Sequence, residues 1–176
     1  MLTIKSAVVI ALALPFALLA EHDWPQWRGP ERDGVWRETG MGTELQTDNE
    51  GWIELKWSVD IGAGYSQPTV ADGRVYVTDR VDHREEIERV HCFDFKTGKL
   101  LWSYQYPAEY TIAYKSGPRA AVLIDTSMND KARAYSLGGM GHLHCLDAKT
   151  GKVIWKRDLA TEYDIEMPRW GIAASP

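Results

Sequence analysis

The sequence predicts an all-β fold: a β-propeller with about two four-stranded blades and a leading strand of a larger ring. A twelve-residue segment that starts at His91 returns at His144 with eight identical positions. Both copies contain the turn Asp-x-x-Thr-Gly, and a Trp follows the turn glycine by four residues. Strand-like runs precede each copy, so each unit holds four strands in an up-and-down order.

The repeated turn predicts a β-hairpin in each unit. In the first copy, Asp94 can accept hydrogen bonds from backbone groups a few residues on, and Gly98 can supply the positive φ that closes the turn. The hairpin is expected to join strands at 90–94 and 100–106. The second copy repeats this arrangement 53 residues later.

Further strands are expected upstream of the hairpins, at 68–71 and 74–78 in the first unit and at 120–124 and 134–137 in the second. A Trp at one fixed place in every repeat is expected to anchor neighbouring units, because it buries about 150–250 Å². Its indole N–H then needs an acceptor in the next unit. The expected anchors are Trp57, Trp102 and Trp155.

The motif Asp-x-x-Thr-Gly-x-x-x-Trp resembles the repeat of the PQQ-like (pyrroloquinoline quinone repeat) propellers. That family includes quinoprotein dehydrogenases, BamB-like outer-membrane assembly proteins and uncharacterised secreted bacterial proteins. The resemblance covers residues 52–176 and implies a PQQ-type (quinoprotein-like) β-propeller. It implies blades at about 64–106 and 117–159 and the start of a third near 171–176. It implies no single activity, because the family uses the blade for catalysis and for scaffolding.

The beginning of the sequence predicts export. Residues 1–20 combine Lys5 with an apolar run that ends at Ala20, which is typical of a cleaved secretory signal peptide. The apolar run is shorter than the about 20 residues that a membrane span needs. We therefore expect a secreted or periplasmic protein with no integral membrane span after signal cleavage.

Residues 21–51 are expected to form an extended N-terminal strap. The segment 24–30 is too rich in Gly and Pro for a regular element, and it is similar to the N-terminal segment of secreted PQQ-like propeller proteins. Our main interpretation packs Trp24 and Trp27 on the propeller flank. The alternative places both of them, with Arg28, in a loop that faces a ligand.

Two further stretches complete the organisation. Residues 52–59 alternate apolar and polar side chains and predict the leading strand, while the charged run 82–89 is typical of a solvated loop. A propeller has 4–8 blades. The sequence is therefore expected to be a fragment or a truncated product of a longer propeller, with the missing blades as its partners, or else a subunit of a ring built from copies.

The cysteines and histidines are expected to be structural. Cys92 and Cys145 occupy equivalent positions on neighbouring units, where packed sheets lie about 10 Å apart. Because a disulfide needs Cα atoms within about 7 Å, both are predicted to be free, buried thiols. His142 and His144 would share one face of a strand and Cys145 the other, so we expect no metal site there.

No catalytic or cofactor-binding residue can be assigned from the sequence. The quinoprotein dehydrogenases that it resembles carry an adjacent Cys-Cys pair over the quinone, and this chain has no such pair. The tyrosines of one aromatic-rich stretch are expected to pack rather than to form a platform for carbohydrate stacking: Tyr104, Tyr106, Tyr110 and Tyr114.

The sequence thus leaves two functions open. We interpret the chain as a non-catalytic binding or assembly scaffold for an unknown protein or polysaccharide ligand. The alternative is a fragment of a PQQ-dependent alcohol or sugar dehydrogenase, which implies PQQ and Ca²⁺ as cofactors. The formal net charge of −5 gives no support to a nucleic-acid partner.

Overall fold

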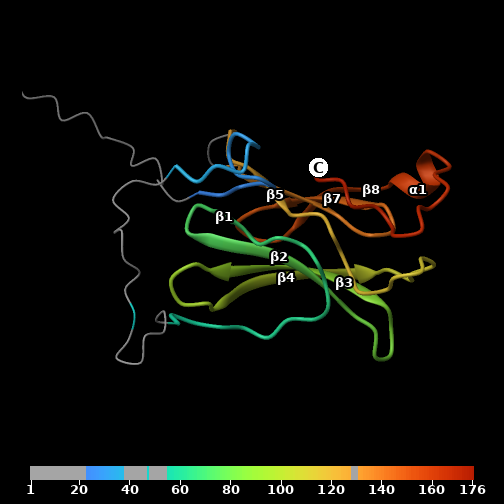
Figure 1. Ribbon diagram of the computed structural model, residues 1–176, viewed down its shortest axis with the longest axis horizontal. Helices are drawn as coiled ribbons and strands as arrows, with labels where there is room; N and C mark the ends of the chain where they lie inside the picture. Colours follow the sequence, from blue (N-terminus) through green and yellow to red (C-terminus); the bar gives the residue numbers. More distant parts are fainter. Residues whose placement is uncertain (1–22, 38–46, 48–54, 128–130) are drawn as a thin grey trace, which may run out of the picture.

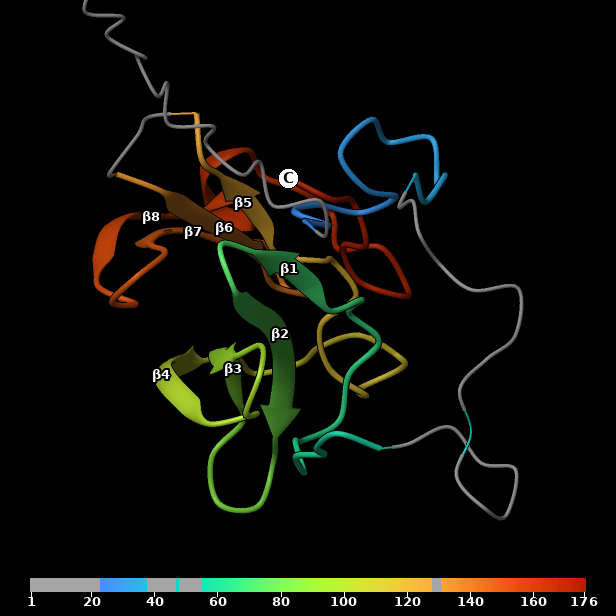
Figure 2. The same cartoon turned by 90° about the vertical axis from the view of Figure 1, so that its left-hand side faces the viewer.

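The strands form two antiparallel four-stranded sheets, which lie as two layers in Figures 1 and 2. The computed structural model describes residues 23–37, 47, 55–127 and 131–176. The first sheet contains β1 (Thr69–Ala71), β2 (Arg74–Val81), β3 (Ile87–Asp94) and β4 (Leu100–Pro107). The second contains β5 (Leu123–Asp125), β6 (Arg133–Leu137), β7 (His142–Asp147) and β8 (Val153–Asp158), followed by the short helix α1 (Leu159–Glu162).

Each sheet follows the chain order of its strands, β1-β2-β3-β4 and β5-β6-β7-β8. This is the up-and-down order of a propeller blade, so the predicted all-β architecture of two four-stranded units is confirmed. The blade limits at 64–106 and 117–159 and the third unit near 171–176 stay predictions. The predicted signal peptide at 1–20 lies outside the described residues.

The repeated turn closes both hairpins as expected. Asp94 Oδ1 accepts hydrogen bonds from Thr97 N at 2.9 Å and from Thr97 Oγ1 at 2.7 Å. Gly98 adopts a φ of 68°. Asp147 makes the same two bonds in the second copy, at 2.8 and 2.7 Å. These hydrogen bonds hold the pKa of both Asp side chains below the usual range.

Trp57 and Trp102 each lie over the turn of the following unit. Trp102 Nε1 donates to Ala148 O at 3.0 Å, and its ring lies against Gly151. Trp57 Nε1 donates to Phe95 O at 2.9 Å, and its ring lies against the turn glycine of the first hairpin. The acceptor predicted in the neighbouring unit is therefore a backbone carbonyl, one residue after the turn Asp.

The main core lies between the two layers and takes side chains from both. From the first sheet and its turns come Ala71, Tyr76, Val90, Cys92 and Trp102, and from the second unit come Val122, Ile124, Ala134, Leu146 and Ala148. Because the sheets bury one face against each other, the anchor tryptophan and the alternating strand residues share a single apolar layer.

The prediction of a leading strand at 52–59 is wrong for the part of this segment that the structure describes. Residues 55–59 form no strand, and 52–54 lie outside the described residues. A strand needs a neighbouring backbone for its hydrogen bonds. Among the described residues only Ala63 forms a bridge near this segment, with Arg80 of β2. Trp57 nevertheless occupies its anchor position.

Two turn glycines offer a matched test of the anchor contact. Gly73 and Gly151 both have a φ near 70°, at 68° and 71°. A Cβ on Gly151 would lie 2.5 Å from the Trp102 ring, whereas a Cβ on Gly73 meets nothing within 4 Å. We expect Gly73→Ala to cost about 1–2 kcal/mol from backbone strain alone, and Gly151→Ala to cost clearly more in denaturant unfolding of the full chain. Equal losses would mean that the Trp102 contact has no energetic weight.

Candidate functional site

A buried carboxylate joins the two sheets at one end. Glu88 of β3 is fully buried, and its oxygens accept hydrogen bonds from the hydroxyls of Tyr106 and Tyr110. Its Oε1 also accepts from Gly139 N of the second unit at 3.0 Å. Burial, followed by the nearby Glu88 charge, raises the pKa of both tyrosines above the usual range, so both hydroxyls stay donors.

This cluster corrects the prediction that the charged run 82–89 is a solvated loop. Asp82 to Glu85 are exposed, but β3 already begins at Ile87. Glu88 lies on the same strand face as the buried Val90, because side chains two apart share a face. The charged residues on both sides of Glu88 made this alternation hard to recognise in the sequence.

A second buried carboxylate, Asp79 of β2, binds a guanidinium and an imidazole. Arg89 lies opposite on β3 and donates to it through Nε at 2.8 Å and Nη2 at 2.5 Å. His91 Nε2 lies 3.1 Å from Oδ1, and Gly62 N donates to Oδ2 at 2.5 Å. Burial raises the pKa of Asp79, but the hydrogen bonds from His91 and Arg89 outweigh it and hold the pKa below the usual range.

A groove of about 360 Å³ separates the outer strands of the two units. One wall carries Tyr104, Tyr106 and Pro107 of β4. The other wall carries residues of β7, β8 and α1: His142, His144, Lys156, Arg157, Asp158 and Glu162. The groove lies within the ~300–1,000 Å³ range of small-molecule sites, and both walls belong to the described residues.

The imidazoles form the inner part of this groove. His142 and His144 share one face of β7 and both contact the Tyr106 ring, at 5.5 and 4.2 Å between centroids. Cys145 Sγ instead lies 3.8 Å from Arg133 Nη1. The predicted placement of the two histidines together and of Cys145 apart from them is therefore confirmed.

His144 makes stability depend on pH. Burial, with the charges of His142 and Lys156, lowers its pKa to about 4, from about 6.5 in an unfolded chain. The unfolded state therefore binds more protons between these values, so this stabilisation is complete above pH 6.5 and is lost as the pH falls toward 4. We expect a loss of about 3 kcal/mol across this window.

The measurement is denaturant unfolding of the full chain at pH 7.5, 6 and 5. The variant His144→Phe keeps a ring against Tyr106 but cannot titrate, so its stability should fall much less than that of the wild type. Parallel pH profiles for the two proteins would contradict the role of His144.

The sequence comparisons agree with the blade geometry. A family model described as outer membrane protein assembly factor BamB, of the PQQ repeat type, matches residues 52–128. This segment contains the whole first sheet, with its Asp-x-x-Thr-Gly turn and the Trp102 anchor. The repeats are similar to those of the PQQ-like β-propeller family.

The curated relatives that match the chain include alcohol dehydrogenases. The chain is 31% identical over 121 residues to the dehydrogenase subunit of an alcohol dehydrogenase (quinone) from Gluconobacter oxydans, covering 64% of this chain. It is 26% identical over 144 residues to a 1-butanol dehydrogenase (cytochrome c) from Thauera butanivorans, covering 79% of this chain. The chain spans only 14% and 19% of these two relatives.

A solved structure of BamB from Moraxella catarrhalis is also similar to the chain. The two share 18% sequence identity with a TM-score of 0.39, over 61% of this chain and 28% of that structure.

The cysteines bear on the expected resemblance to quinoprotein dehydrogenases, which carry an adjacent Cys-Cys pair. Cys92 and Cys145 are free and buried, as predicted, and burial raises the pKa of Cys92 to about 11. The sequence has no adjacent cysteines. The described residues contain no group of three or more His, Cys, Asp or Glu side chains placed to hold a metal ion.

The N-terminal segment runs along the inner edges of both sheets. Trp24 pairs with Val70 of β1, through Trp24 N to Val70 O at 2.8 Å and the reverse bond at 3.0 Å. Pro25 O accepts from Ile124 N of β5 at 2.8 Å. This segment lies beside β1 and β5 in Figure 1. It therefore ties the two units together at the backbone.

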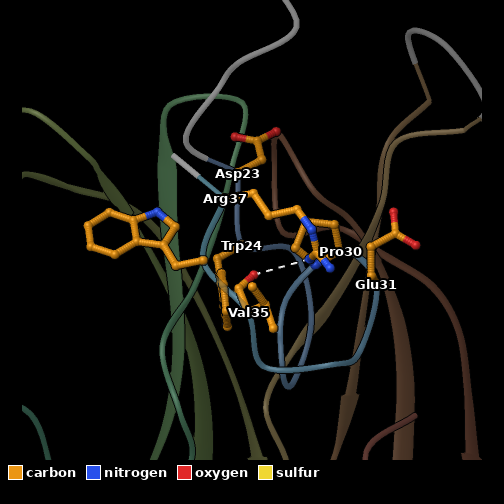
Figure 3. Close-up of a pocket in the computed structure, with 7 residues that line it drawn as sticks. Asp23, Trp24, Pro30, Glu31, Val35 and Arg37 are labelled. Atoms are coloured by element: carbon orange, nitrogen blue, oxygen red, sulfur yellow. Dashed lines mark hydrogen bonds between the residues drawn. The ribbon is translucent and has the colours of Figure 1, made fainter. Parts of the chain in front are cut away.

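The same segment forms a small pocket of about 220 Å³, which Figure 3 shows. Arg37 Nη1 donates to Val35 O there at 3.3 Å. Trp24 is half-buried, but Trp27 is 51% exposed, so the expected packing of Trp27 is wrong. The reason is local, because Trp27 lies in a tight turn that Gly29 N closes.

The four tyrosines of the aromatic-rich stretch do not all pack as expected. Tyr106 and Tyr110 are buried and Tyr104 is half-buried. Tyr114 is 44% exposed and stacks on Tyr65, with 5.8 Å between ring centroids and 2.6 Å between hydroxyl oxygens. The difference arises because Tyr114 follows the strand and lies in a loop.

Proposed function

We propose that the chain contributes blades to a non-catalytic PQQ-like propeller that acts as a binding or assembly scaffold. The observation that carries this proposal is the use of the buried carboxylates. Glu88 accepts three hydrogen bonds, one of which comes from Gly139 N of the second unit, and Asp79 is bound by Arg89 and His91. Neither carboxylate has the freedom that proton transfer to a substrate requires.

We place this scaffold in the periplasm or outside the cell. The support is the predicted signal peptide at 1–20 together with the match to the BamB-type family model. Among the described residues, no helix has the length and apolar character to cross a membrane. The ligand of such a scaffold is a protein or a polysaccharide.

A titration with PQQ and Ca²⁺ tests this proposal. We expect the tryptophan fluorescence of the full chain to show no saturable quenching, and dye-linked oxidation of ethanol and 1-butanol to stay at the level of a blank. A quinoprotein alcohol dehydrogenase assayed in parallel provides the positive control. Saturable quenching together with alcohol oxidation would refute the scaffold function.

The second candidate is a part of a PQQ-dependent dehydrogenase. The observation in its favour is that the curated relatives, such as the G. oxydans and T. butanivorans proteins, are named as alcohol dehydrogenases. Under this candidate the quinone and its Ca²⁺ would be bound by residues other than those described. The titration above separates the two candidates directly.

A further inference from the structure

The two units differ at one cluster of polar side chains. In the first sheet, the Asp79 carboxylate is bound by the Arg89 guanidinium and lies beside the His91 imidazole. Asp79 lies within β2, opposite Arg89 of β3. When the hairpins are aligned by register, Gly138 directly after β6 takes the place of Asp79, and its N–H donates to His142 O. The second unit therefore has no carboxylate of its own at this place.

His142 and His144 stand where the first unit has its guanidinium and its imidazole. The Nδ1 atoms of both are buried and form no hydrogen bond with the described residues. Ser136 lies opposite His144 on β6, and its Oγ is likewise buried without a hydrogen-bond partner among the described residues. His144 is only 3% exposed and lines the groove. Buried polar groups without partners call for a ligand or an ordered water.

Glu88 of the first sheet does not supply the missing acidic partner. Its carboxylate lies so close to Gly138 that a Cβ there would meet Oε2 at 2.1 Å. Its hydrogen bonds, however, go to the hydroxyls of Tyr106 and Tyr110 and to Gly139 N. Within the described part of the chain, the Nδ1 atoms of both imidazoles therefore stay without a hydrogen-bond partner.

The other charges of the groove leave one cation without an acidic partner. Arg157 is paired with Glu162, and Asp158 accepts from Thr161 N at 3.1 Å and from its Oγ1 at 2.8 Å. Lys156 lies opposite His144 on β8 and forms no ion pair within the part of the chain that the structure describes.

We propose that this groove binds a small organic acid with a planar apolar body. The carboxylate would pair with the Lys156 ammonium and accept an imidazole N–H. In the first unit, the Asp79 carboxylate likewise lies beside a cation, Arg89, and an imidazole, His91. The body would lie against the half-buried ring of Tyr104 and against Pro107 on the opposite wall. This binding does not depend on whether the protein oxidises alcohols, so it stands apart from the scaffold proposal.

The test is calorimetric titration of the full chain with benzoate and with benzamide, its uncharged analogue. We expect saturable binding of benzoate and at least tenfold weaker binding of benzamide. Lys156→Gln should weaken benzoate binding at least tenfold. The matched control is Lys152→Gln, which removes an exposed lysine of the turn outside the groove and should leave the affinity unchanged.

Three results would overturn the proposal. The first is equal binding of benzoate and benzamide, and the second is equal weakening by Lys156→Gln and Lys152→Gln. The third is a crystal structure grown with saturating benzoate that shows only ordered water on the imidazole Nδ1 atoms. A benzoate carboxylate seated between Lys156 and His142 or His144 would support it.

Discussion

Trp102→Ala is expected to destabilise the full chain by about 3–5 kcal/mol, the cost of removing a large buried aromatic side chain. Trp102 is buried between the sheets, packs on Gly151 and donates to Ala148 O at 3.0 Å. Its removal leaves a cavity in the core that both units share, and Ala148 O keeps only its hydrogen bond from the Tyr76 hydroxyl at 3.2 Å. Chemical denaturation followed by circular dichroism measures the loss.

The repeat supplies its own control for this prediction. Trp155 occupies the same position in the second unit but is 38% exposed, and its indole N–H has no acceptor in the part of the chain that the structure describes. Trp155→Ala should therefore cost far less than Trp102→Ala. Similar losses at the two positions would show that the repeat position, and not the contact with the following turn, determines the stability.

The repeat made most of the fold predictable. Two copies of one hairpin fix the strand direction, the turn and the anchor at once, because each feature must hold in both copies. The buried thiols of Cys92 and Cys145 follow from the same symmetry. The strand predicted at 52–59 failed because alternation alone cannot show whether a neighbouring backbone is present.

The polar cluster of Glu88 was not predictable in the same way. Its partners Tyr106, Tyr110 and Gly139 come from β4, the following loop and the second unit, and no local pattern links them. One signal was available, since the alternation of Cys92 and Val90 extends back to Glu88 on the buried face. The neighbouring charges made the segment look like a solvated loop instead.

The groove was beyond sequence reasoning for a related reason. The motif identified His142 and His144 as neighbours on one face, but Tyr104 and Tyr106 reach them from another unit. Only the packing of the two sheets shows that the imidazole Nδ1 atoms end without partners. The strand register of the two hairpins is also needed to recognise that Gly138 replaces Asp79 in the second unit.

Glu88→Ala is the second change with a large expected effect. It removes the acceptor of three hydrogen bonds. The hydroxyls of Tyr106 and Tyr110 and the N–H of Gly139 are then buried without an acceptor. Each of the three donors left without an acceptor costs about 1–3 kcal/mol, so we expect a total loss of at least about 3 kcal/mol. Unfolding in guanidinium chloride measures this loss against the wild type.

Glu88→Gln separates the hydrogen bonds from the bulk of the side chain. Its amide oxygen can still accept from Tyr110 and Gly139, and its NH₂ can donate to the Tyr106 hydroxyl, which turns from donor to acceptor. We therefore expect Glu88→Gln to cost only about 1 kcal/mol. Tyr106→Phe in the Glu88→Gln background should then add little beyond one neutral hydrogen bond. If Glu88→Ala and Glu88→Gln prove equally mild, the cluster does not hold the two units together, and the groove beside it would have to be formed by the tryptophan anchor alone.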